Sequence, residues 1–305
     1  MVPIDDVAPA VAEADRRMKP LAVLIAVTAV WGVTFVQVKD AVALYPLFAF
    51  LALRFAIASL TLAPPGARRL RTLGRGGWAA GAFAGALLGG GYALQTAGLE
   101  RTSVSSTGFI TGMSVVLTPL LAFALFRAHV GSSAWIGVAL ATVGLALLSG
   151  IHSGAVLGDL LVLAGSATYS LQIVLMERYA PRYDAIAFTL VEMVTSFAGL
   201  LAIAVALGQL HVPHGRTVWG ALLVTGVFAS ALAFLAQTWA QRRATATQTA
   251  VAFSLEPVWA AFFGFTLAGD RLGSLGWIGC AVIMAGIVVA EPAAAGVLAR
   301  LARRL

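Results

Sequence analysis

The 305-residue chain is 60% hydrophobic and 11% charged, with a mean hydropathy of +0.92, whereas soluble domains carry about 25% charged residues. This composition indicates an integral membrane protein, and the spans it requires leave no room for a soluble ATPase or kinase domain. The net charge of +7 does not indicate nucleic-acid binding, because the basic residues fall in short segments between apolar runs, where membrane topology accounts for them.

The two ends of the chain are polar. We expect residues 1–19 to form a short, disordered cytoplasmic tail, because they lack the order of positive, apolar and small residues that marks a signal peptide. Residues 292–305 are expected to form a basic cytoplasmic tail. The single cysteine, Cys280, excludes an intrachain disulfide.

Apolar runs of about 17–25 residues, separated by Gly, Pro or charged residues, predict ten transmembrane helices. The expected segments are 21–39, 44–63, 78–98, 105–126, 134–150, 156–176, 185–207, 217–238, 246–268 and 274–290. Closely spaced runs, such as those meeting near Leu44 and Gly131, leave a count of eight or nine open.

The distribution of Lys and Arg predicts the orientation. With a cytoplasmic N-terminus, one set of loops holds fifteen basic residues and the other holds four, with Arg54 left inside a span. Cytoplasmic loops carry such an excess of positive charge. The bias therefore supports ten spans in the cytoplasmic (inner) membrane, with both termini in the cytoplasm.

The two halves of the chain resemble each other, over residues 20–151 and 155–291. A shift of 138 residues aligns Trp31-x-x-Thr34 with Tyr169-x-x-Gln172, Arg54 with Glu192, and Pro119 with Pro257. A shift of 142 aligns Gln95-Thr96 with Gln237-Thr238, Trp135-x-Gly137 with Trp277-x-Gly279, and Gly144 with Gly286. The register of the fourth and ninth segments stays open between the two shifts.

Five spans per half is an odd number, so the second half enters the membrane from the opposite side. The predicted fold is therefore an all-α membrane protein of two inverted five-helix repeats. Such repeats are typical of alternating-access transporters, with a substrate site near the midplane and around broken helices. A duplicated membrane scaffold without transport is the structural alternative.

Glu256 and Pro257 lie side by side within the apolar run 246–268. Proline removes a backbone donor and frees the carbonyl four residues earlier, so we expect a break in the helix here, and Pro119 is the candidate for a break in the first half. A carboxylate at membrane depth is expected to face protein or a water-filled cavity. The alternative is a purely structural kink with a buried, protonated Glu256.

Arg54 and Glu192 each lie about nine residues into an expected helix, so both approach the membrane midplane. An ion pair between them would lower the cost of two buried charges. Arg54 could instead bind the carboxylate of a substrate.

Polar and aromatic residues recur at helical spacing in the expected first and sixth spans. Trp31 with Thr34, and Tyr169 with Gln172, each occupy one helix face. Together with Gln95 and Gln237, they are candidates for the wall of a cavity that binds a small amphipathic solute. Packing between membrane helices uses the same residue types and is the alternative.

No pattern indicates a metal site, a cofactor or a catalytic residue. His211 and His214 have no Cys, Asp or Glu nearby that would complete a zinc site. We therefore predict a protein that is not an enzyme and has no metal or cofactor.

Several motifs resemble those of the EamA family of the drug/metabolite transporter superfamily. They are Trp31-Gly32-Val33-Thr34-Phe35, Tyr92-Ala93-Leu94-Gln95-Thr96-Ala97-Gly98-Leu99, Gly108-Phe109-Ile110-Thr111-Gly112, Leu117-Thr118-Pro119-Leu120, Leu255-Glu256-Pro257-Val258 and Gly269-Asp270-Arg271-Leu272. The resemblance covers about residues 20–291. The sequence departs from the family pattern at Asp270, where Glu is usual, and around Arg127-Ala128-His129, where an acidic residue is missing.

The resemblance implies ten helices around a central cavity and export of amino acids, related metabolites or drugs across the cytoplasmic membrane. We expect a secondary transporter with a small-molecule substrate, surrounded by lipid bilayer, with protons as a candidate coupling ion through Glu256. Uniport and a homodimer are left open. The alternative classes are a membrane-embedded enzyme acting on lipid or prenyl substrates, and a channel.

Overall fold

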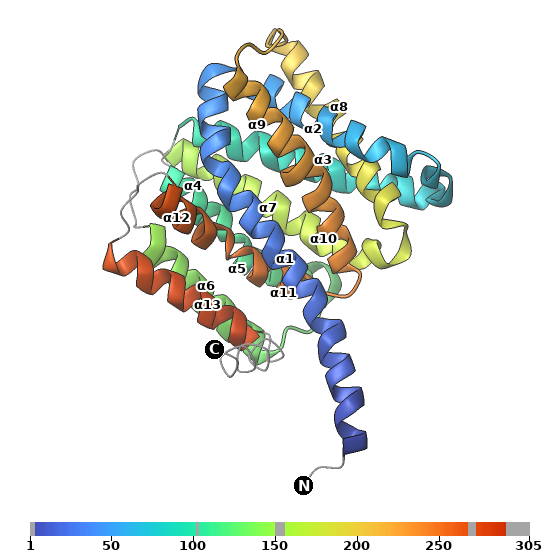
Figure 1. Ribbon diagram of the computed structural model, residues 1–305, viewed down its shortest axis with the longest axis vertical. Helices are drawn as coiled ribbons and strands as arrows, with labels where there is room; N and C mark the ends of the chain where they lie inside the picture. Colours follow the sequence, from blue (N-terminus) through green and yellow to red (C-terminus); the bar gives the residue numbers. More distant parts are fainter. Residues whose placement is uncertain (1–3, 102–103, 150–155, 268–272, 291–305) are drawn as a thin grey trace.

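The computed structural model describes residues 4–101, 104–149, 156–267 and 273–290. Within these ranges every regular element is a helix, and the helices form an elongated bundle in which most run roughly along one diagonal (Figure 1). The expected basic tail over 292–305 and the motif over 269–272 lie outside the described residues.

Most of the helices coincide, within a few residues, with the expected apolar segments or with parts of them, whereas α1 begins well before its expected segment. Their bounds are α1 Ile4–Leu44, α2 Leu47–Gly66, α3 Gly74–Leu99, α4 Val104–Gly112, α5 Ser114–Phe126, α6 Ser132–Ser149, α7 Val156–Tyr179, α8 Ala185–Ala206, α9 Arg216–Gly226, the π-helix η3 Val227–Leu232, α10 Ala233–Gln241, α11 Ala246–Phe253, α12 Glu256–Leu267 and α13 Ser274–Ala290. Two short 3₁₀ turns, η1 Arg69–Thr72 and η2 Ala180–Arg182, lie in connections.

Several of these helices are long and apolar enough to cross a membrane. Four qualify among the described residues: Leu47–Gly66, Val156–Arg182, Ala185–Ala206 and Arg216–Gln241. Shorter apolar helices cover Lys19–Thr34, Ile110–Phe126, Ser132–Leu147 and Ser274–Ala290. The chain is therefore a multi-pass membrane protein.

The helix boundaries fix the register of the two repeats. The helices α3, α4, α5 and α6 begin 142 residues before α9, α11, α12 and α13, respectively, whereas α2 begins 138 residues before α8. The four extra residues thus enter between the second and third helices of the second repeat. The alignment of Pro119 with Pro257, which needs a shift of 138, is therefore wrong.

Contacts between α6 and α13 show that the repeats are inverted. A Cβ atom added to Gly137 would lie 2.6 Å from the carbonyl oxygen of Gly286, and one on Gly144 would lie 2.7 Å from that of Gly279. The early glycine of each helix thus meets the late glycine of the other, so the two helices are antiparallel. Their backbones touch because these positions carry no side chains.

Both repeats contain a broken helix at the same place. The fourth expected segment is divided at Met113 into α4 and α5, and the ninth is divided at Ser254 and Leu255 into α11 and α12. Pro257 is the second residue of α12, in the first turn, where the missing N–H costs no hydrogen bond. The helix is thus interrupted beside Glu256, as the sequence predicted.

Two expectations need correction. Pro119 lies inside α5, and the break in the first repeat is six residues earlier, at Met113. The proline is accommodated within an apolar helix that has already restarted, so it breaks nothing. Residues 4–19 were expected to be disordered, but α1 begins at Ile4 and continues through them without interruption.

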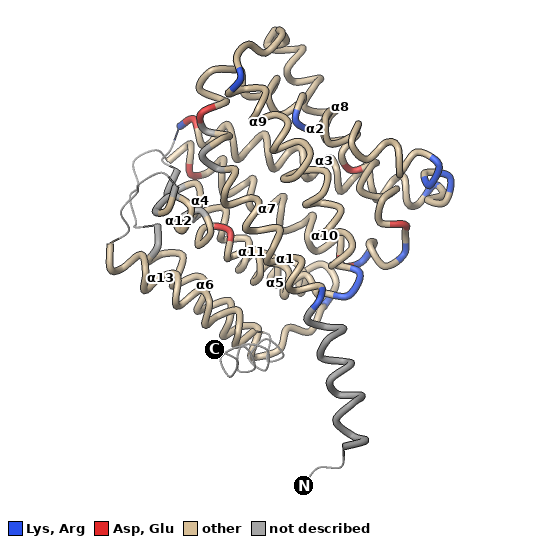
Figure 2. Tube along the Cα trace, viewed as in Figure 1, with Lys and Arg blue, Asp and Glu red and all other residues tan. Residues whose placement is uncertain are grey.

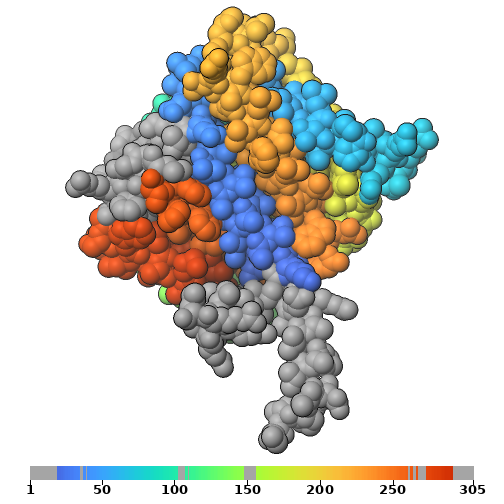
Figure 3. Space-filling view, in the orientation of Figure 1, coloured from blue at the N-terminus to red at the C-terminus, as the bar shows by residue number. Residues whose placement is uncertain are grey.

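The glycine stripe of α3 lets this helix pack directly on α8. An added Cβ on Gly81 would approach Val191, one on Gly85 would lie 2.4 Å from the carbonyl oxygen of Glu192, and one on Gly89 would meet Ser196. This contact joins the third helix of the first repeat to the second repeat. On the face drawn in Figure 3, α1 runs diagonally between α9–α10 on one side and α12–α13 on the other.

The loops gather at two opposite ends of the bundle. At one end, Arg69 Nη1 donates to Asp184 Oδ2 over 3.0 Å, and the backbone N–H of Ala246 donates to Glu177 Oε2 over 2.9 Å. At the other end, Tyr45 donates its hydroxyl to the carbonyl of His211, and the side chain of Gln209 accepts from the Phe48 N–H. These contacts bring loops of the first repeat together with loops of the second repeat at each end.

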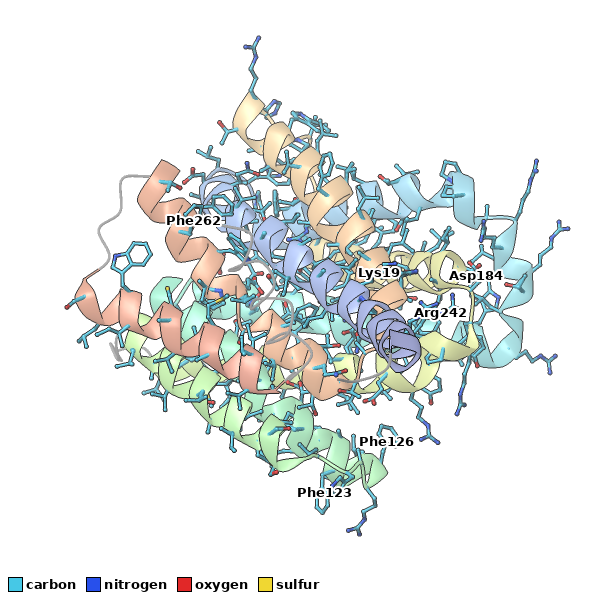
Figure 4. All side chains as sticks on the ribbon, turned by 60° about the horizontal axis from the view of Figure 1, so that its bottom comes forward. Lys19, Phe123, Phe126, Asp184, Arg242 and Phe262 are labelled. Atoms are coloured by element: carbon cyan, nitrogen blue, oxygen red, sulfur yellow. The ribbon has the colours of Figure 1, made fainter. Side chains whose placement is uncertain are left out.

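Basic residues concentrate at one of these ends. Figure 2 shows most of the blue segments at the ends of α2, α7 and α10 and few at the opposite end. Lys19, Asp184 and Arg242 lie on this side of the molecule in Figure 4, whereas Phe123 and Phe126 project outward from α5. Both phenylalanines are exposed, as expected for side chains in contact with lipid.

Candidate functional site

A cavity of about 60 Å³ lies between helices of the two repeats. The residues that line it are Trp31, Thr34, Val38, Leu51, Arg54, Tyr92, Gln95, Thr96, Leu99, Thr107 and Glu256. Most come from α1, α2 and α3, whereas Glu256 begins α12 in the second repeat. Five of the nine residues predicted for substrate binding therefore line one cavity.

Arg54 is held at the cavity by several partners. Its Nε donates to Ser230 Oγ over 2.7 Å, and Nη2 donates to the hydroxyl of Tyr92 over 3.1 Å and to the carbonyl of Ala229 over 3.3 Å. The guanidinium carbon lies 4.6 Å from the centre of the Tyr92 ring, within the range of a cation–π interaction. No partner for Nη1 occurs among the described residues.

The π-helix η3 supplies a backbone carbonyl that accepts hydrogen bonds from two residues of the cavity wall, Arg54 and Trp31. The N–H of Ala233, which would bond to Ala229 in a regular α-helix, bonds instead to the carbonyls of Phe228 and Ser230. The Ala229 carbonyl accepts from Arg54 and also from Trp31 Nε1, over 2.8 Å. A single π-helical turn inside an α-helix often marks a functional site.

The aromatic and amide side chains form a second wall. Gln95 Nε2 donates to Thr111 Oγ1 over 2.8 Å, and Gln95 Oε1 accepts from the Tyr169 hydroxyl over 3.1 Å. The rings of Tyr169 and Tyr92 are in edge contact, with centroids 5.6 Å apart. Tyr169 therefore does not line the cavity itself but contacts two residues that do, Gln95 and Tyr92.

The broken helix α4–α5 is tied to the same wall. Its break leaves the carbonyl of Thr111 available, and Ser166 Oγ on α7 donates to it over 3.1 Å. Backbone groups freed at membrane depth need such partners, because lipid offers none. The break and the polar face of α7 thus stabilise each other.

Glu256 lies at the first position of α12, directly after the break. It lines the cavity, and no hydrogen-bond partner for its carboxylate occurs among the described residues. The positive charge of Arg54 lies near enough to interact with it electrostatically, but the two side chains form no ion pair. Two ionisable side chains, Arg54 and Glu256, thus face one cavity from different repeats.

Three predicted residues form a separate cluster. Gln172 Nε2 donates to Glu192 Oε1 over 2.7 Å, and Gln237 Nε2 donates to Gln172 Oε1 over 3.1 Å. All three side chains are buried, and none lines the cavity. The pairing of Arg54 with Glu192 is therefore wrong: each has other partners, because Arg54 turns toward η3 and Glu192 toward α7.

Sequence reasoning did not select Tyr92, Thr111 or Ser230 as site residues. Tyr92 could have been found, because it lies three residues before Gln95 and so shares its helix face. Ser230 could not, because its position depends on the π-helix, and neither proline nor charge marks that turn in the sequence.

The cavity is small for a metabolite. A volume of about 60 Å³ accommodates a few water molecules, whereas pockets that enclose drug-sized ligands measure roughly 300–1,000 Å³. In this structure the polar residues therefore surround a space that is too small to enclose a drug-sized ligand.

Two inverted repeats, two broken helices and a polar cavity lined from both repeats are typical of membrane transporters. The chain belongs to the EamA-like transporter family, which matches residues 18–150 and 156–290. The resemblance that the motifs suggested is thereby confirmed, and each repeat matches the family separately.

Individual relatives agree with this assignment. An uncharacterized transporter of Archaeoglobus fulgidus is 30% identical over 282 residues, which cover 91% of this chain and 87% of the relative. An uncharacterized transporter of Synechocystis is 27% identical over 62% of this chain and 64% of its own length. A solved crystal structure aligns over 90% of this chain and 96% of its own, with a TM-score of 0.76 and 18% identity, and shows the fold alone.

Proposed function

We propose that this chain is a secondary transporter that exports small metabolites, such as amino acids and related compounds or drugs, across the cytoplasmic membrane by alternating access. The observation that carries the proposal is the cavity between the repeats, lined by Arg54 from one and by Glu256 from the other. Because the two charged groups belong to different repeats, a solute that bridges them responds to the relative position of the repeats.

The chemistry of the cavity favours a zwitterionic solute. Arg54 offers a guanidinium N–H to a carboxylate, and Glu256 offers a carboxylate to an ammonium group. Trp31 and Tyr92 provide aromatic surface for an apolar side chain. An α-amino acid or a related compound carries all three features, whereas a simple anion or cation uses only one of the charges.

Glu256 is proposed to couple the broken helix to the solute. Glu256 is the first residue of α12, and its carboxylate has no protein partner among the described residues. A bound cation or proton therefore changes the electrostatic environment of the carboxylate directly. Binding at the start of α12 thus acts on a helix segment that the break at Ser254 and Leu255 separates from α11.

The export experiment compares the growth medium of cells overproducing the parent chain with that of cells overproducing Glu256→Gln, at equal membrane levels. Untargeted mass spectrometry should find a metabolite enriched only with the parent chain. The substitution keeps the shape of the side chain and removes its charge, so folding is expected to be retained.

Arg54→Gln separates binding from folding. If the cavity binds a zwitterion, this variant should lose export of compounds that carry a carboxylate and retain export of compounds without one. Equal export of all compounds by the parent chain and both variants, at equal membrane levels, would contradict the proposed site.

A further inference from the structure

Glu192 on α8 is completely buried, away from the cavity, and only one of its oxygens has a partner. Gln172 donates to Oε1 over 2.7 Å, whereas Oε2 has no hydrogen-bond partner in the described part of the chain. Glu192 therefore has an unsatisfied oxygen at membrane depth, where lipid offers such a group no hydrogen-bond partner.

A chain of three glutamines continues from this carboxyl group. Gln241 Nε2 donates to the carbonyl of Ile173 over 2.9 Å, which turns Gln241 Oε1 toward Gln237. Gln237 Nε2 donates to both Gln241 Oε1 and Gln172 Oε1, over 2.8 and 3.1 Å. Because a carbonyl can only accept, the first bond fixes the direction of all the others.

This direction leaves a second unsatisfied acceptor. The amide nitrogen of Gln237 supplies both of its bonds, and its Oε1 is buried with no partner among the described residues. Turning the Gln237 amide around would place its oxygen against two other oxygens. The cluster therefore contains two buried acceptors, Glu192 Oε2 and Gln237 Oε1, and lacks a donor.

No positive charge compensates Glu192. Charged and titratable groups on the helices around Glu192 have other partners. Arg54 of α2 donates to Ser230 and Tyr92. On α7, Tyr169 donates to Gln95, and Glu177 accepts from the Ala246 N–H. At the start of α8, Asp184 pairs with Arg69, and α3 and α10 carry their arginines only at or beyond their ends. An ionised Glu192 would be an unpaired buried charge, which is strongly unfavourable.

We propose that Glu192, with Gln172, Gln237 and Gln241, forms a buried proton-binding site that is separate from the solute cavity. The proton adds to Oε2 of the carboxylate and forms a neutral carboxylic acid. Its new O–H group supplies the donor that the cluster lacks, and Gln237 Oε1 is the unpaired acceptor of the cluster that it is proposed to reach. The ligand of this site is the proton itself.

The site has a route for releasing its proton, which rests on the proposed transport function. The helix α3 of the first repeat covers α8 at Glu192, where an added Cβ on Gly85 would lie 2.4 Å from the Glu192 carbonyl. A movement between the repeats that separates α3 from α8 admits water beside Glu192. The proton bound in this conformation is then the one that the transport cycle exchanges.

Infrared difference spectroscopy on the purified protein in lipid tests the site without any substrate. A rise in pH should remove the C=O band of a protonated carboxylic acid, and this band should shift in D₂O. Glu192→Gln supplies a neutral amide with its own N–H donor, so it should fold and lose the component of the band that belongs to Glu192. The matched control Glu256→Gln should retain it.

Gln237→Leu provides a second readout that does not depend on Glu192→Gln. Removal of the acceptor should move the carboxylic acid band to higher frequency, because its O–H loses the hydrogen bond, without abolishing it. A band that survives in Glu192→Gln and disappears in Glu256→Gln would place the proton in the cavity and overturn the proposal. The absence of a band from the parent protein at neutral pH would overturn it as well.

Flux measurements in proteoliposomes then test coupling, using a metabolite identified in the export experiment. Glu192→Gln should exchange labelled for unlabelled metabolite but lose accumulation driven by a pH gradient. Accumulation driven equally well by the parent and this variant, or driven by Na⁺ alone, would exclude Glu192 as the coupling site. If no metabolite is transported, the proposed function fails, and the infrared result still decides whether Glu192 holds a proton.

Discussion

Gly85 and Gly90 lie five residues apart on α3 and meet different surroundings. A Cβ on Gly85 would come within 2.9 Å of two backbone atoms of Glu192, whereas a Cβ on Gly90 would find nothing within 4 Å. Gly85→Ala is therefore expected to destabilise the protein by about 1–3 kcal/mol, since backbone atoms cannot yield as side chains do. Gly90→Ala should leave stability unchanged or raise it by up to about 1 kcal/mol.

Thermal unfolding of the two purified variants, followed in the same detergent, checks this prediction. The comparison uses the same substitution in the same helix, so helix propensity and detergent affect both variants alike. Equal losses of stability in both variants would mean that α3 does not pack on α8 at Gly85.

Asp184 caps the start of α8 by accepting from the Ala187 N–H over 3.0 Å and also pairs with Arg69. Burial raises the pKa of this carboxyl, but the bonds to the Ala187 N–H and the Arg69 guanidinium outweigh burial and lower the pKa below 3.8 overall. A lowered pKa means that the stabilisation is present above the ordinary value and disappears as the pH falls through the folded value.

Asp184→Ala should cost about 1 kcal/mol, as expected for the loss of a helix cap. Asp184→Asn keeps an oxygen for the cap and removes the charge, so its deficit should be smaller. That deficit should shrink as the pH falls from 3.8 through the lowered folded pKa, because the parent side chain becomes neutral in the folded protein only there. Melting temperatures measured across this pH range would refute the assignment if the deficit stayed constant.

At the scale of the element, η3 is the feature on which the cavity depends. Its Ala229 carbonyl accepts from both Trp31 and Arg54. This carbonyl is available to side chains because the π-helical turn contains one residue more than a regular α-helical turn, so the Ala233 N–H bonds elsewhere. Deletion of Phe228, whose side chain is exposed, should restore a continuous α-helix from Arg216 to Gln241 and withdraw the carbonyl.

We expect this deletion to leave the protein in the membrane and abolish export of the metabolite that the parent chain exports. Deletion of the exposed Leu223, in the preceding regular helix α9, is the control, since it should disturb packing as well as export. Normal export after deletion of Phe228 would show that the π-helical turn does not form the site.

The two broken helices show what sequence can and cannot predict at this scale. The break beside Glu256 was predictable, because Pro257 cannot donate to the preceding turn and a carboxylate avoids lipid. The break at Met113 was not, because no proline accompanies it and its freed carbonyl is satisfied by Ser166 from a distant segment. Helix limits follow from local apolar runs, whereas the partners of Arg54 and Glu192 depend on packing between helices.

At the scale of the whole molecule, the contacts between loops predict a topology that can be tested. The pairs Arg69–Asp184 and Tyr45–His211 join loops at opposite ends of the bundle. The excess of basic residues predicts that the first end faces the cytoplasm. In a Cys280→Ser background, a cysteine at Arg71 should be labelled only from the cytoplasmic side, and one at His214 only from outside.

Membrane-impermeant maleimide applied to spheroplasts and to inverted vesicles distinguishes the two sides. Both positions are exposed in the structure, so labelling reports sidedness and not burial. Labelling of both cysteines from the same side would contradict the ten-crossing arrangement. Labelling of the Arg71 position only from outside and of the His214 position only from the cytoplasm would mean that the protein has the opposite orientation in the membrane.

The narrow cavity has a thermodynamic consequence for affinity. If only a fraction of molecules adopts the wider conformation that admits a solute, the measured dissociation constant equals the intrinsic one divided by that fraction. A tenfold rarer open state weakens apparent affinity tenfold, equivalent to about 1.4 kcal/mol, with no change in any contact to the solute. Substitutions far from Arg54 and Glu256 that favour opening will therefore tighten binding, and selection can tune affinity through this equilibrium alone.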